Sequence, residues 1–300
     1  MSQTQVTIAG VTLKNPVMTA SGTFGSGQEY REFYDLGRLG AVVTKGVAPV
    51  PWEGNPTPRV AETPSGMLNA IGLQNPGIDT FLKRDLPLLL ESDTCIVVNV
   101  CGHTVEEYCE VVSRLAGAPV DLLEINVSCP NIREGGLAFG QDPKELARVT
   151  RAVRKEARQP VIVKLSPNVT DIVTMAKTAE EAGADAISLI NTLLGMKIDI
   201  YNRRFVLANR TGGLSGPAIR PVAVRMVYDV AHAVSIPVIG MGGIMTGEDA
   251  VEFLMAGASA VCVGTATFHD PWAAVKVADG IEAFLEREGI EDIHEIIKAV

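Results

Sequence analysis

Lysine and asparagine residues end the apolar segments of this chain, and their side chains could act together in one site. Each ends or directly follows a run rich in valine and isoleucine. Burying such groups beside apolar neighbours is costly unless each finds a partner. Lysines offer positive charge, and amides offer both a hydrogen-bond donor and an acceptor. One alone would often simply meet solvent, but their shared placement at run ends indicates a common site. These residues are Lys45, Asn99, Asn126, Lys164 and Asn191, and the hydroxyl of Ser21 follows the first run in the same way.

Glycine clusters follow two further apolar runs and suit a phosphate group. Gly242-Gly243 and Gly264-Thr265 lie at run ends, and a third cluster spans residues 211–216. Glycine lets backbone N–H groups approach an anion closely, and a helix that begins nearby adds the positive end of its dipole. Any single cluster could merely make a tight turn. Three clusters together favour a phosphorylated cofactor.

Two side chains are candidates for covalent or acid–base chemistry. Lys164 could stabilise negative charge on a reduced cofactor ring or form a Schiff base, and its position alone leaves both roles open. Cys129 lies in the polar segment Asn126-Val127-Ser128-Cys129-Pro130-Asn131, directly after an apolar run. Free cysteine is most often a small buried apolar residue, but this setting favours a functional thiol. The four histidines lie in no comparable motif, so no cysteine–histidine pair is predicted.

The other cysteines predict no metal site. Cys95, Cys101, Cys109 and Cys262 fall on predicted strands or helices, and no C-x₂-C pair occurs. A zinc site or an iron–sulfur cluster held by this chain alone is therefore not expected. An odd number of cysteines without framework spacing is typical of a reducing compartment, so we expect a cytoplasmic protein.

These side chains can meet only if the fold brings the ends of the apolar runs to one face. Eight runs alternate with amphipathic helical stretches, and most are continuously apolar, as parallel strands buried on both faces are. We expect an α/β fold, a (β/α)₈ TIM barrel with its chemistry at the carboxyl ends of the strands. A doubly wound open sheet is the second choice. The predicted strands are residues 16–20, 41–45, 95–100, 121–127, 161–165, 186–190, 237–241 and 260–264.

Helix starts and long loops are also marked in the sequence. Asp142-Pro143 and Asp270-Pro271 each predict a capping acid followed by proline at the first helical position. Two connections, residues 46–77 and 191–220, exceed ordinary loop lengths, and long ordered loops are usually functional. Segments 196–200 and 204–208 could pair as a hairpin, and residues 6–13 predict a small N-terminal hairpin at the barrel bottom. No linker interrupts the chain, so we expect one domain over residues 1–300.

Composition excludes several classes of protein. Hydrophobic residues make up 47% of the chain and charged residues 20%, which suits a large buried core and argues against disorder. The formal net charge of −9 argues against a nucleic-acid partner, because like charges repel. No apolar run has the length of a membrane span, and the first residues lack the pattern of a signal peptide. We therefore expect a protein that acts on small molecules away from the membrane.

The segment Asn126-Val127-Ser128-Cys129-Pro130-Asn131 resembles the active-site segment of class 1 dihydroorotate dehydrogenases, in which the cysteine is the catalytic base. Class 2 enzymes, which are membrane-associated and quinone-linked, carry serine there. Residues 45–46, 69–75, 211–216 and 240–244 also match, and the resemblance covers essentially the whole chain. It implies an FMN-binding TIM barrel that oxidises (S)-dihydroorotate to orotate in de novo pyrimidine biosynthesis.

The resemblance also assigns roles to single residues, with Cys129 as the general base and no metal. The positions that match the FMN-binding residues of the family are Ser21, Lys45, Gly46, Asn99, Asn126, Lys164, Ile190, Gly216, Gly242, Gly243, Gly264 and Thr265. The positions that match the dihydroorotate-binding residues are Lys45, Asn69, Ala70, Ile71, Gly72, Leu73, Asn126, Asn191 and Thr192. The Gly135-Gly136 pair would let the Cys129 segment open and close as a lid.

Within class 1, residues 135–140 and 207–216 resemble the 1B subgroup. This implies a partner subunit that carries FAD and a [2Fe–2S] cluster and passes electrons to NAD⁺, in a heterotetramer of two catalytic and two electron-transfer chains. The 1A homodimers, which reduce fumarate, usually differ in both segments and are the alternative.

Two other classes of protein stay open on the residues alone. A Schiff-base aldolase barrel would use Lys164 covalently and would need no flavin. A non-catalytic binder of a phosphorylated ligand would need the glycine clusters but not the Cys129 motif.

Overall fold

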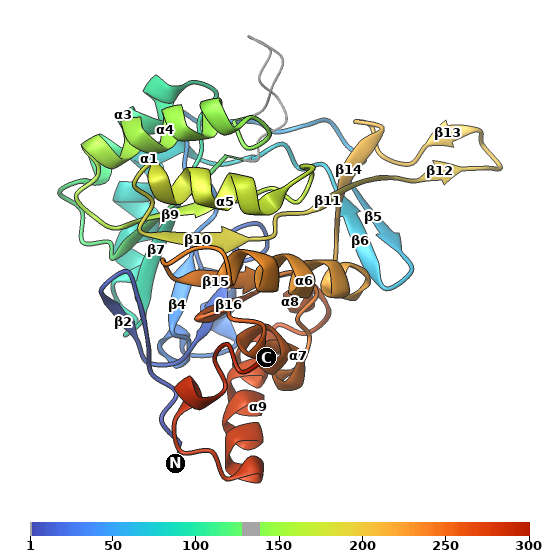
Figure 1. Cartoon of the computed structure of the whole chain (residues 1–300). Helices are drawn as coiled ribbons and strands as arrows, with labels where there is room; N and C mark the ends of the chain where they lie inside the picture. The colour runs from blue at the N-terminus through green and yellow to red at the C-terminus, as the bar shows by residue number, and fades with distance from the viewer. Residues whose placement is uncertain (1, 128–138) are drawn as a thin grey trace.

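The computed structural model describes residues 2–127 and 139–300, and its eight parallel strands close into a barrel (Figure 1). The strands neighbour one another in the order β10-β15-β16-β3-β4-β7-β8-β9, so the chain runs once around the barrel. The expected (β/α)₈ barrel is confirmed, and each predicted strand boundary lies within two residues of the observed one. The strands are β3 (Val17–Thr19), β4 (Ala41–Val43), β7 (Cys95–Val100), β8 (Leu122–Asn126), β9 (Val161–Lys164), β10 (Ala186–Leu189), β15 (Val238–Met241) and β16 (Ala260–Val263).

Helices cover the outside of the barrel (Figure 1). The longer ones are α3 (Val105–Leu115), α4 (Pro143–Glu156), α5 (Ile172–Glu181), α6 (Arg220–Ala231), α7 (Gly247–Met255) and α9 (Ala273–Glu288). Shorter ones are α1 (Gly77–Thr80), α2 (Leu86–Leu89) and α8 (Ala266–His269). The first connection departs from the expected strand–helix rhythm, because two 3-10 turns, Tyr30–Glu32 and Leu36–Arg38, replace a long helix between β3 and β4. Gly25 and Gly27 there adopt positive φ, which interrupts a helix.

One of the two proline-marked helix starts is confirmed and the other is wrong. The Asp142 carboxylate accepts hydrogen bonds from the backbone N–H groups of Lys144 (2.7 Å) and Glu145 (3.2 Å), and α4 begins at Pro143. Asp270 instead accepts from the N–H of Trp272 at 3.0 Å, and α9 begins only at Ala273. Pro271 therefore lies in a turn before the helix.

The two long connections form a second sheet that the sequence pattern did not predict. This antiparallel sheet has the order β11-β14-β6-β5 and stands beside the open end of the barrel (Figure 1). Its strands β5 (Val60–Thr63) and β6 (Gly66–Asn69) come from the first connection, whereas β11 (Leu193–Met196) and β14 (Thr211–Ser215) come from the second. Leu68 of β6 pairs with Leu214 of β14, far along the chain. Local periodicity carries no signal for such a pairing.

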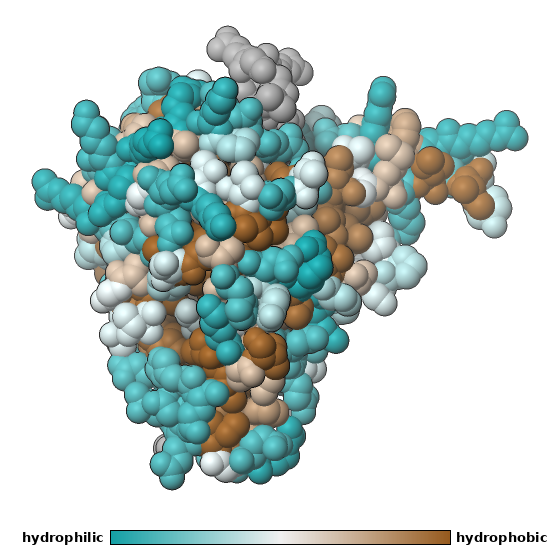
Figure 2. All heavy atoms as spheres, in the orientation of Figure 1, coloured by the Kyte–Doolittle hydropathy of each residue, from teal (hydrophilic) through white to brown (hydrophobic). Residues whose placement is uncertain are grey.

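A short hairpin projects from this sheet. Strands β12 (Ile198–Asp199) and β13 (Arg204–Phe205) pair inside the segments expected to do so. Figure 2 shows apolar side chains on this projecting arm. Ile198 is 54% exposed and Ile200 71% exposed, so the arm contributes little to the core.

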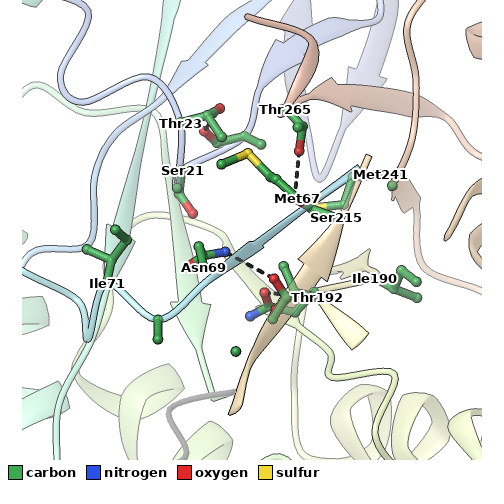
Figure 3. A pocket seen from close by; sticks show the side chains of 18 of the residues that line it. Ser21, Thr23, Met67, Asn69, Ile71, Ile190, Thr192, Ser215, Met241 and Thr265 are labelled. Carbon is green, nitrogen blue, oxygen red and sulfur yellow. Dashed lines mark hydrogen bonds between the residues drawn. The ribbon is translucent and has the colours of Figure 1, made fainter. Parts of the chain in front are cut away.

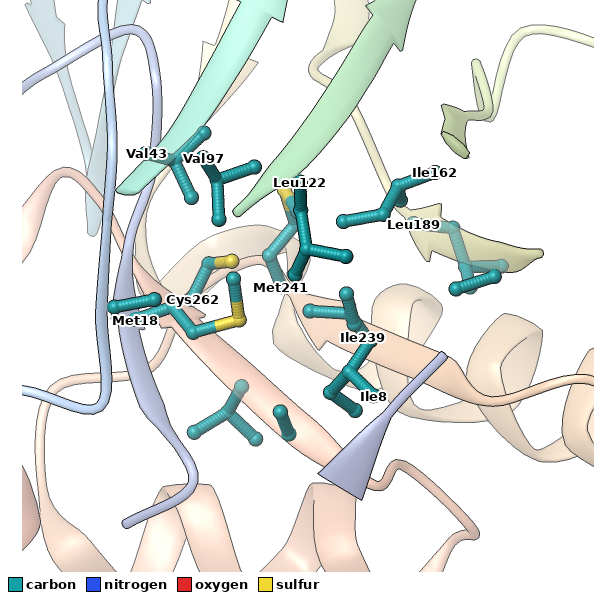
Figure 4. Close-up of a cluster of buried hydrophobic side chains, with 14 of the residues drawn as sticks. Ile8, Met18, Val43, Val97, Leu122, Ile162, Leu189, Ile239, Met241 and Cys262 are labelled. Carbon is teal, nitrogen blue, oxygen red and sulfur yellow. The ribbon is translucent and has the colours of Figure 1, made fainter. Parts of the chain in front are cut away.

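The amino-terminal end of the barrel interior is apolar and closed. Strands β1 (Val6–Ile8) and β2 (Val11–Leu13) form the expected N-terminal hairpin. The buried Ile8 side chain lies beside Ile239 and below the ring of strands (Figure 4). Met18, Val97 and Ile162 fill the same region from other strands. This packing holds the strands in place and leaves their opposite ends free to carry a site.

Candidate active site

A cavity of about 1010 Å³ lies at the carboxyl ends of the barrel strands. Barrel strand ends form one part of its wall, and the four-stranded sheet forms another. Figure 3 shows Met67 of β6 and Ser215 of β14 facing Ser21 and Thr265 from the barrel. Every residue that the sequence assigned to cofactor or substrate binding lines this cavity. Cys129, Gly135 and Gly136 lie outside the described residues.

Lys164 ends β9 on the inner side of the cavity and is 5% exposed. Its ammonium group donates to the Ser21 hydroxyl at 3.3 Å. The same Nζ lies 3.8 Å from Oε1 of Glu124, a carboxylate that is 2% exposed. A buried cation is tolerated when it has a counter-charge and hydrogen bonds. The strand-end lysine is therefore a charged group held within the cavity wall.

Glu124 connects Lys164 to two further strands. Asn99 donates from Nδ2 to Glu124 Oε1 at 2.6 Å, and Ser188 donates from its hydroxyl to Oε2 at 2.8 Å. Asn99 is fully buried, and its Oδ1 atom has no hydrogen-bond partner among the described residues. Because buried polar atoms are nearly always satisfied, this oxygen indicates an acceptor position for a ligand.

Lys45 supplies a second positive charge on the cavity wall, directly after β4. Burial lowers the pKa of Lys45, nearby Cys101 opposes that shift, and the charge of Lys164 adds to it. Two ammonium groups near each other are easier to accommodate when an anionic ligand joins them. This end of the cavity therefore suits an anion.

The glycine clusters meet at one corner of the cavity. Gly216 and Gly243 both have positive φ, and a Cβ atom at Gly243 would lie 2.8 Å from the Gly216 carbonyl oxygen. Only glycine allows these two loops to approach so closely. Thr265 donates from its hydroxyl to the Ser215 hydroxyl at 2.8 Å, which joins β14 to the loop after β16 (Figure 3). The corner offers backbone and hydroxyl groups to a phosphate.

The helix that follows Gly243 is capped by its own residues. Helix α7 begins four residues after Gly243, and its first turn is capped by Thr246 and Asp249. The Asp249 carboxylate also accepts from the N–H of Met245 at 2.9 Å. The N–H groups of Met245, Thr246 and Asp249 thus have partners within the chain.

Of the assigned substrate residues, Asn69 to Leu73 and Thr192 lie in or beside the second sheet, whereas Lys45, Asn126 and Asn191 end or follow barrel strands. Asn69 ends β6 and donates from Nδ2 to the Gly213 carbonyl at 3.5 Å (Figure 3). Thr192 points toward the same place, and its N–H donates to Asn191 Oδ1 at 2.8 Å. Asn168 holds this segment by donating to the Thr192 carbonyl at 3.0 Å. Amide and hydroxyl groups from both long connections thus converge.

The described residues on either side of the Cys129 segment meet at the cavity. Val127 and Gly140 both line it, and the Gly140 N–H donates to the Val127 carbonyl at 2.9 Å. Tyr108 of α3 donates from its hydroxyl to the Asn126 carbonyl at 2.6 Å, beneath that point. The chain that contains Cys129 therefore leaves and rejoins the described structure at the cavity wall.

Sequence reasoning missed the polar residues Glu124, Ser188 and Asn168 of this region and the apolar Met67, whereas Ser215 lies in the predicted cluster 211–216. Glu124 carried a usable signal, because it is two residues before Asn126 and so faces the same side of its strand. The others depend on pairings between distant segments.

Two negative findings concern the described part of the chain. Within residues 2–127 and 139–300, no three or more His, Cys, Asp or Glu side chains are grouped to hold a metal ion. None of the helices there has the length and apolarity that crossing a lipid bilayer requires.

Comparison with known proteins places this geometry in one family. The family model for dihydroorotate dehydrogenase matches residues 3–285. The catalytic subunit of dihydroorotate dehydrogenase B (NAD(+)) from Lachnoclostridium phytofermentans is 65% identical over 297 residues, which is 99% of each chain. The protein of the same name from Geobacter sulfurreducens is 58% identical over 296 residues, 98% of this chain and 97% of that one.

A solved structure agrees in fold across the chain. The dihydroorotate dehydrogenase of Eimeria tenella, determined in complex with ferulenol, superposes with a TM-score of 0.83 at 26% identity. The match covers 99% of this chain and 88% of that one. The family-model match and the full-length relatives show that this chain belongs to the dihydroorotate dehydrogenase family.

Proposed function

We propose that this dihydroorotate dehydrogenase is the FMN-binding catalytic subunit of an NAD⁺-linked enzyme of the B type. It oxidises (S)-dihydroorotate to orotate in pyrimidine synthesis. The observation that carries the proposal is the single cavity that gathers all the described residues assigned to cofactor and substrate. The full-length relatives named as NAD(+)-linked catalytic subunits support the B type over the fumarate-reducing 1A type. Family membership also sets the Schiff-base aldolase aside.

The residues present fit FMN. The glycine corner suits one phosphate, and the sequence has no G-x-G-x-x-G after its first strand that would suit a dinucleotide. Asn99 Oδ1 is a buried acceptor without a partner among the described residues, and a flavin ring carries an imide N–H that such an atom can accept. Ser21 and Lys164 would hold the ring on the barrel side, and Gly216, Gly243 and Thr265 the phosphate. When bound, FMN supplies the acceptor for the hydride that leaves C6 of dihydroorotate.

The chain itself handles substrate binding and the proton. Lys45 would attract the carboxylate of dihydroorotate, because both its charge and its place on the cavity wall suit an anion. Asn69, Asn126 and Asn191 would pair with the imide edge of the pyrimidine, which needs donors and acceptors together. Cys129 would take the proton from C5 as a thiolate, since a cysteine with an ordinary pKa near 8.5 is partly ionised near neutral pH.

We infer that the electrons gained by this chain leave it through a partner subunit. The sequence has no cysteine set spaced for an iron–sulfur cluster and no second nucleotide-binding fingerprint. We propose a partner subunit with FAD and a [2Fe–2S] cluster that delivers the electrons to NAD⁺. Two catalytic and two electron-transfer chains would form the complex, and it would act in the cytoplasm.

The cofactor and the reaction are tested together on the purified chain. We expect a yellow protein that releases FMN on denaturation, identified by chromatography. Dihydroorotate added without oxygen should bleach the flavin absorbance near about 450 nm, with stoichiometric orotate. Release of FAD, or of no flavin, would overturn the cofactor assignment. A flavin that dihydroorotate does not bleach would overturn the substrate assignment.

The electron acceptor is tested by adding the partner. The chain should be assayed alone and after co-expression with the FAD and iron–sulfur subunit from its own genome. We expect negligible NAD⁺ reduction by the chain alone and substantial reduction by a co-purifying complex. Efficient fumarate reduction by the isolated chain, without a complex, would assign it to the 1A type.

A further inference from the structure

Glu124 is a carboxylate buried one layer beneath the cavity. It lies on β8 between Leu122, whose side chain packs in the apolar interior, and Asn126, which lines the cavity. These three residues share one face of the strand, because side chains alternate along it. Glu124 itself does not line the cavity, whereas its partners Asn99 and Lys164 do. Any effect on a bound ligand therefore passes through those partners.

The contacts of Glu124 orient the Asn99 amide. An ionised carboxylate can only accept hydrogen bonds, so the Nδ2 end of Asn99 must face Glu124, at 2.6 Å. The Oδ1 end then points away, and it is buried without a partner among the described residues. Ser188 holds the other carboxylate oxygen at 2.8 Å and fixes Glu124 in turn. A flavin imide N–H is a donor of the kind that this oxygen lacks.

Glu124 also opposes the positive charge of Lys164. The two charged atoms lie 3.8 Å apart, and both side chains are almost fully buried. Solvent therefore screens the pair poorly, and the carboxylate acts on the same region as the ammonium group. Burial raises the pKa of Cys262 strongly, and the charge of Glu124 raises it further while Lys164 lowers it. Both charges thus reach this part of the barrel interior.

We propose that Glu124 is a positioning residue for the flavin site, which aims the Asn99 carbonyl oxygen at the cavity and lowers the reduction potential of the bound flavin. The negative charge opposes the entry of electrons that Lys164 favours. A lower potential makes the reduced flavin a better donor to the next acceptor. A wholly structural ion pair would require neither partners on the cavity wall nor an Asn99 oxygen that lacks a partner among the described residues. This inference rests on the proposed binding of FMN.

The test is the flavin midpoint potential of the Glu124→Gln protein with FMN bound, compared with wild type. Glutamine keeps the shape and an acceptor oxygen but removes the charge. We expect a more positive potential, with the ratio of reduced to oxidised flavin raised about tenfold or more at a fixed applied potential. For a two-electron couple this is about 30 mV. The matched control is Leu122→Ala, two residues earlier on the same strand, which alters packing in the apolar interior without changing charge and should leave the potential unchanged.

A second comparison tests the proposal if the Glu124→Gln protein fails to fold. Lys164→Gln leaves a buried carboxylate unpaired, whereas the double variant Glu124→Gln/Lys164→Gln leaves neither charge. The double variant should have the more positive potential and the tighter FMN binding of the two. An unchanged or more negative potential in either comparison, or an equal shift in Leu122→Ala, would overturn the role of Glu124. A wild-type protein that holds no flavin would instead overturn the proposed function.

Discussion

The two ends of the barrel interior are built by the same eight strands and differ in almost every chemical respect. At the amino end, Ile8, Met18 and Ile162 are at most 1% exposed and pack within the cluster of hydrophobic side chains in Figure 4. At the carboxyl end, Lys164 and Glu124 are nearly as buried, but they carry charge. The change from one kind of interior to the other takes two residues along β9, from Ile162 to Lys164.

This difference separates stability from function. Apolar side chains are stabilised by burial alone, at roughly 25 cal/mol per Å² of surface removed from water. Buried charges need partners, and they gain little stability even when paired. We therefore expect substitutions at the amino end to change mainly the free energy of unfolding, and substitutions at the carboxyl end to change mainly flavin chemistry. Four predictions test that division.

The largest effect is expected for Cys129→Ala. Loss of a general base typically slows the proton-transfer step by about 10² to 10⁴-fold. Dihydroorotate-driven flavin reduction, followed by stopped flow, should slow by that factor while FMN stays bound. Cys129→Ser should also be slow at neutral pH, because a hydroxyl is a much weaker acid than a thiol. The control is Cys109→Ala on α3. Near wild-type reduction by Cys129→Ala would mean that another residue is the base.

Ile162→Ala should separate the two ends most clearly. Truncating a fully buried isoleucine typically costs about 2 to 5 kcal/mol of unfolding free energy. The flavin midpoint potential should stay that of wild type, although Lys164 is only two residues away. Ile198→Ala, on the exposed arm, should change the stability by no more than about 0.5 kcal/mol. Urea unfolding measures the free energy of unfolding of both variants. Equal losses in the two variants would contradict the assignment of the amino end as the stabilising core.

The binding of orotate should weaken in alkaline solution because of Lys45. Burial lowers the pKa of Lys45, so it loses its charge at a lower pH than an exposed lysine does. The folded protein holds this proton less tightly than the unfolded chain. Keeping Lys45 charged therefore destabilises the folded protein at pH values below the lowered pKa. This destabilisation disappears as the pH rises from the lowered pKa to the pKa of an exposed lysine.

An anionic ligand needs the charged form, so its affinity follows the opposite trend. Orotate affinity should fall by up to about tenfold per pH unit above the lowered pKa, the limit for one linked proton. Flavin absorbance titrations between neutral and alkaline pH measure it. Lys45→Gln should bind orotate weakly throughout and lose this dependence. If the orotate affinity of Lys45→Gln fell in alkaline solution as that of wild type does, a group other than Lys45 would be responsible.

The smallest effect is expected for Ser215→Ala. The Ser215 hydroxyl accepts a hydrogen bond from Thr265 at 2.8 Å, beside the glycine corner. Loss of one neutral hydrogen bond costs about 0.5 to 1.5 kcal/mol, so the FMN dissociation constant should rise a few-fold. Fluorescence titration of the apoprotein with FMN measures it, with the exposed Ser113→Ala as control. An unchanged dissociation constant would show that this hydrogen bond does not contribute to FMN binding.

The sequence by itself determined the strands, the barrel and the polar residues at the strand ends. Runs such as residues 95–98 and 161–163 are continuously apolar because both faces of a barrel strand are buried, and that pattern is local. The polar residue that ends each run is local as well. Because parallel strands bring their carboxyl ends to one rim, the convergence of Lys45, Asn99 and Lys164 followed from the barrel itself.

Tertiary structure alone decided which of these groups touch. Glu124 meets Asn99, Lys164 and Ser188 across three other strands, and those contacts depend on the stagger between strands, which no local pattern records. The four-stranded sheet arises in the same way, from pairing between two distant loops. Local periodicity specifies which face a side chain occupies. The partner it meets there depends on how the closed barrel aligns its strands, and that alignment is a property of the whole fold.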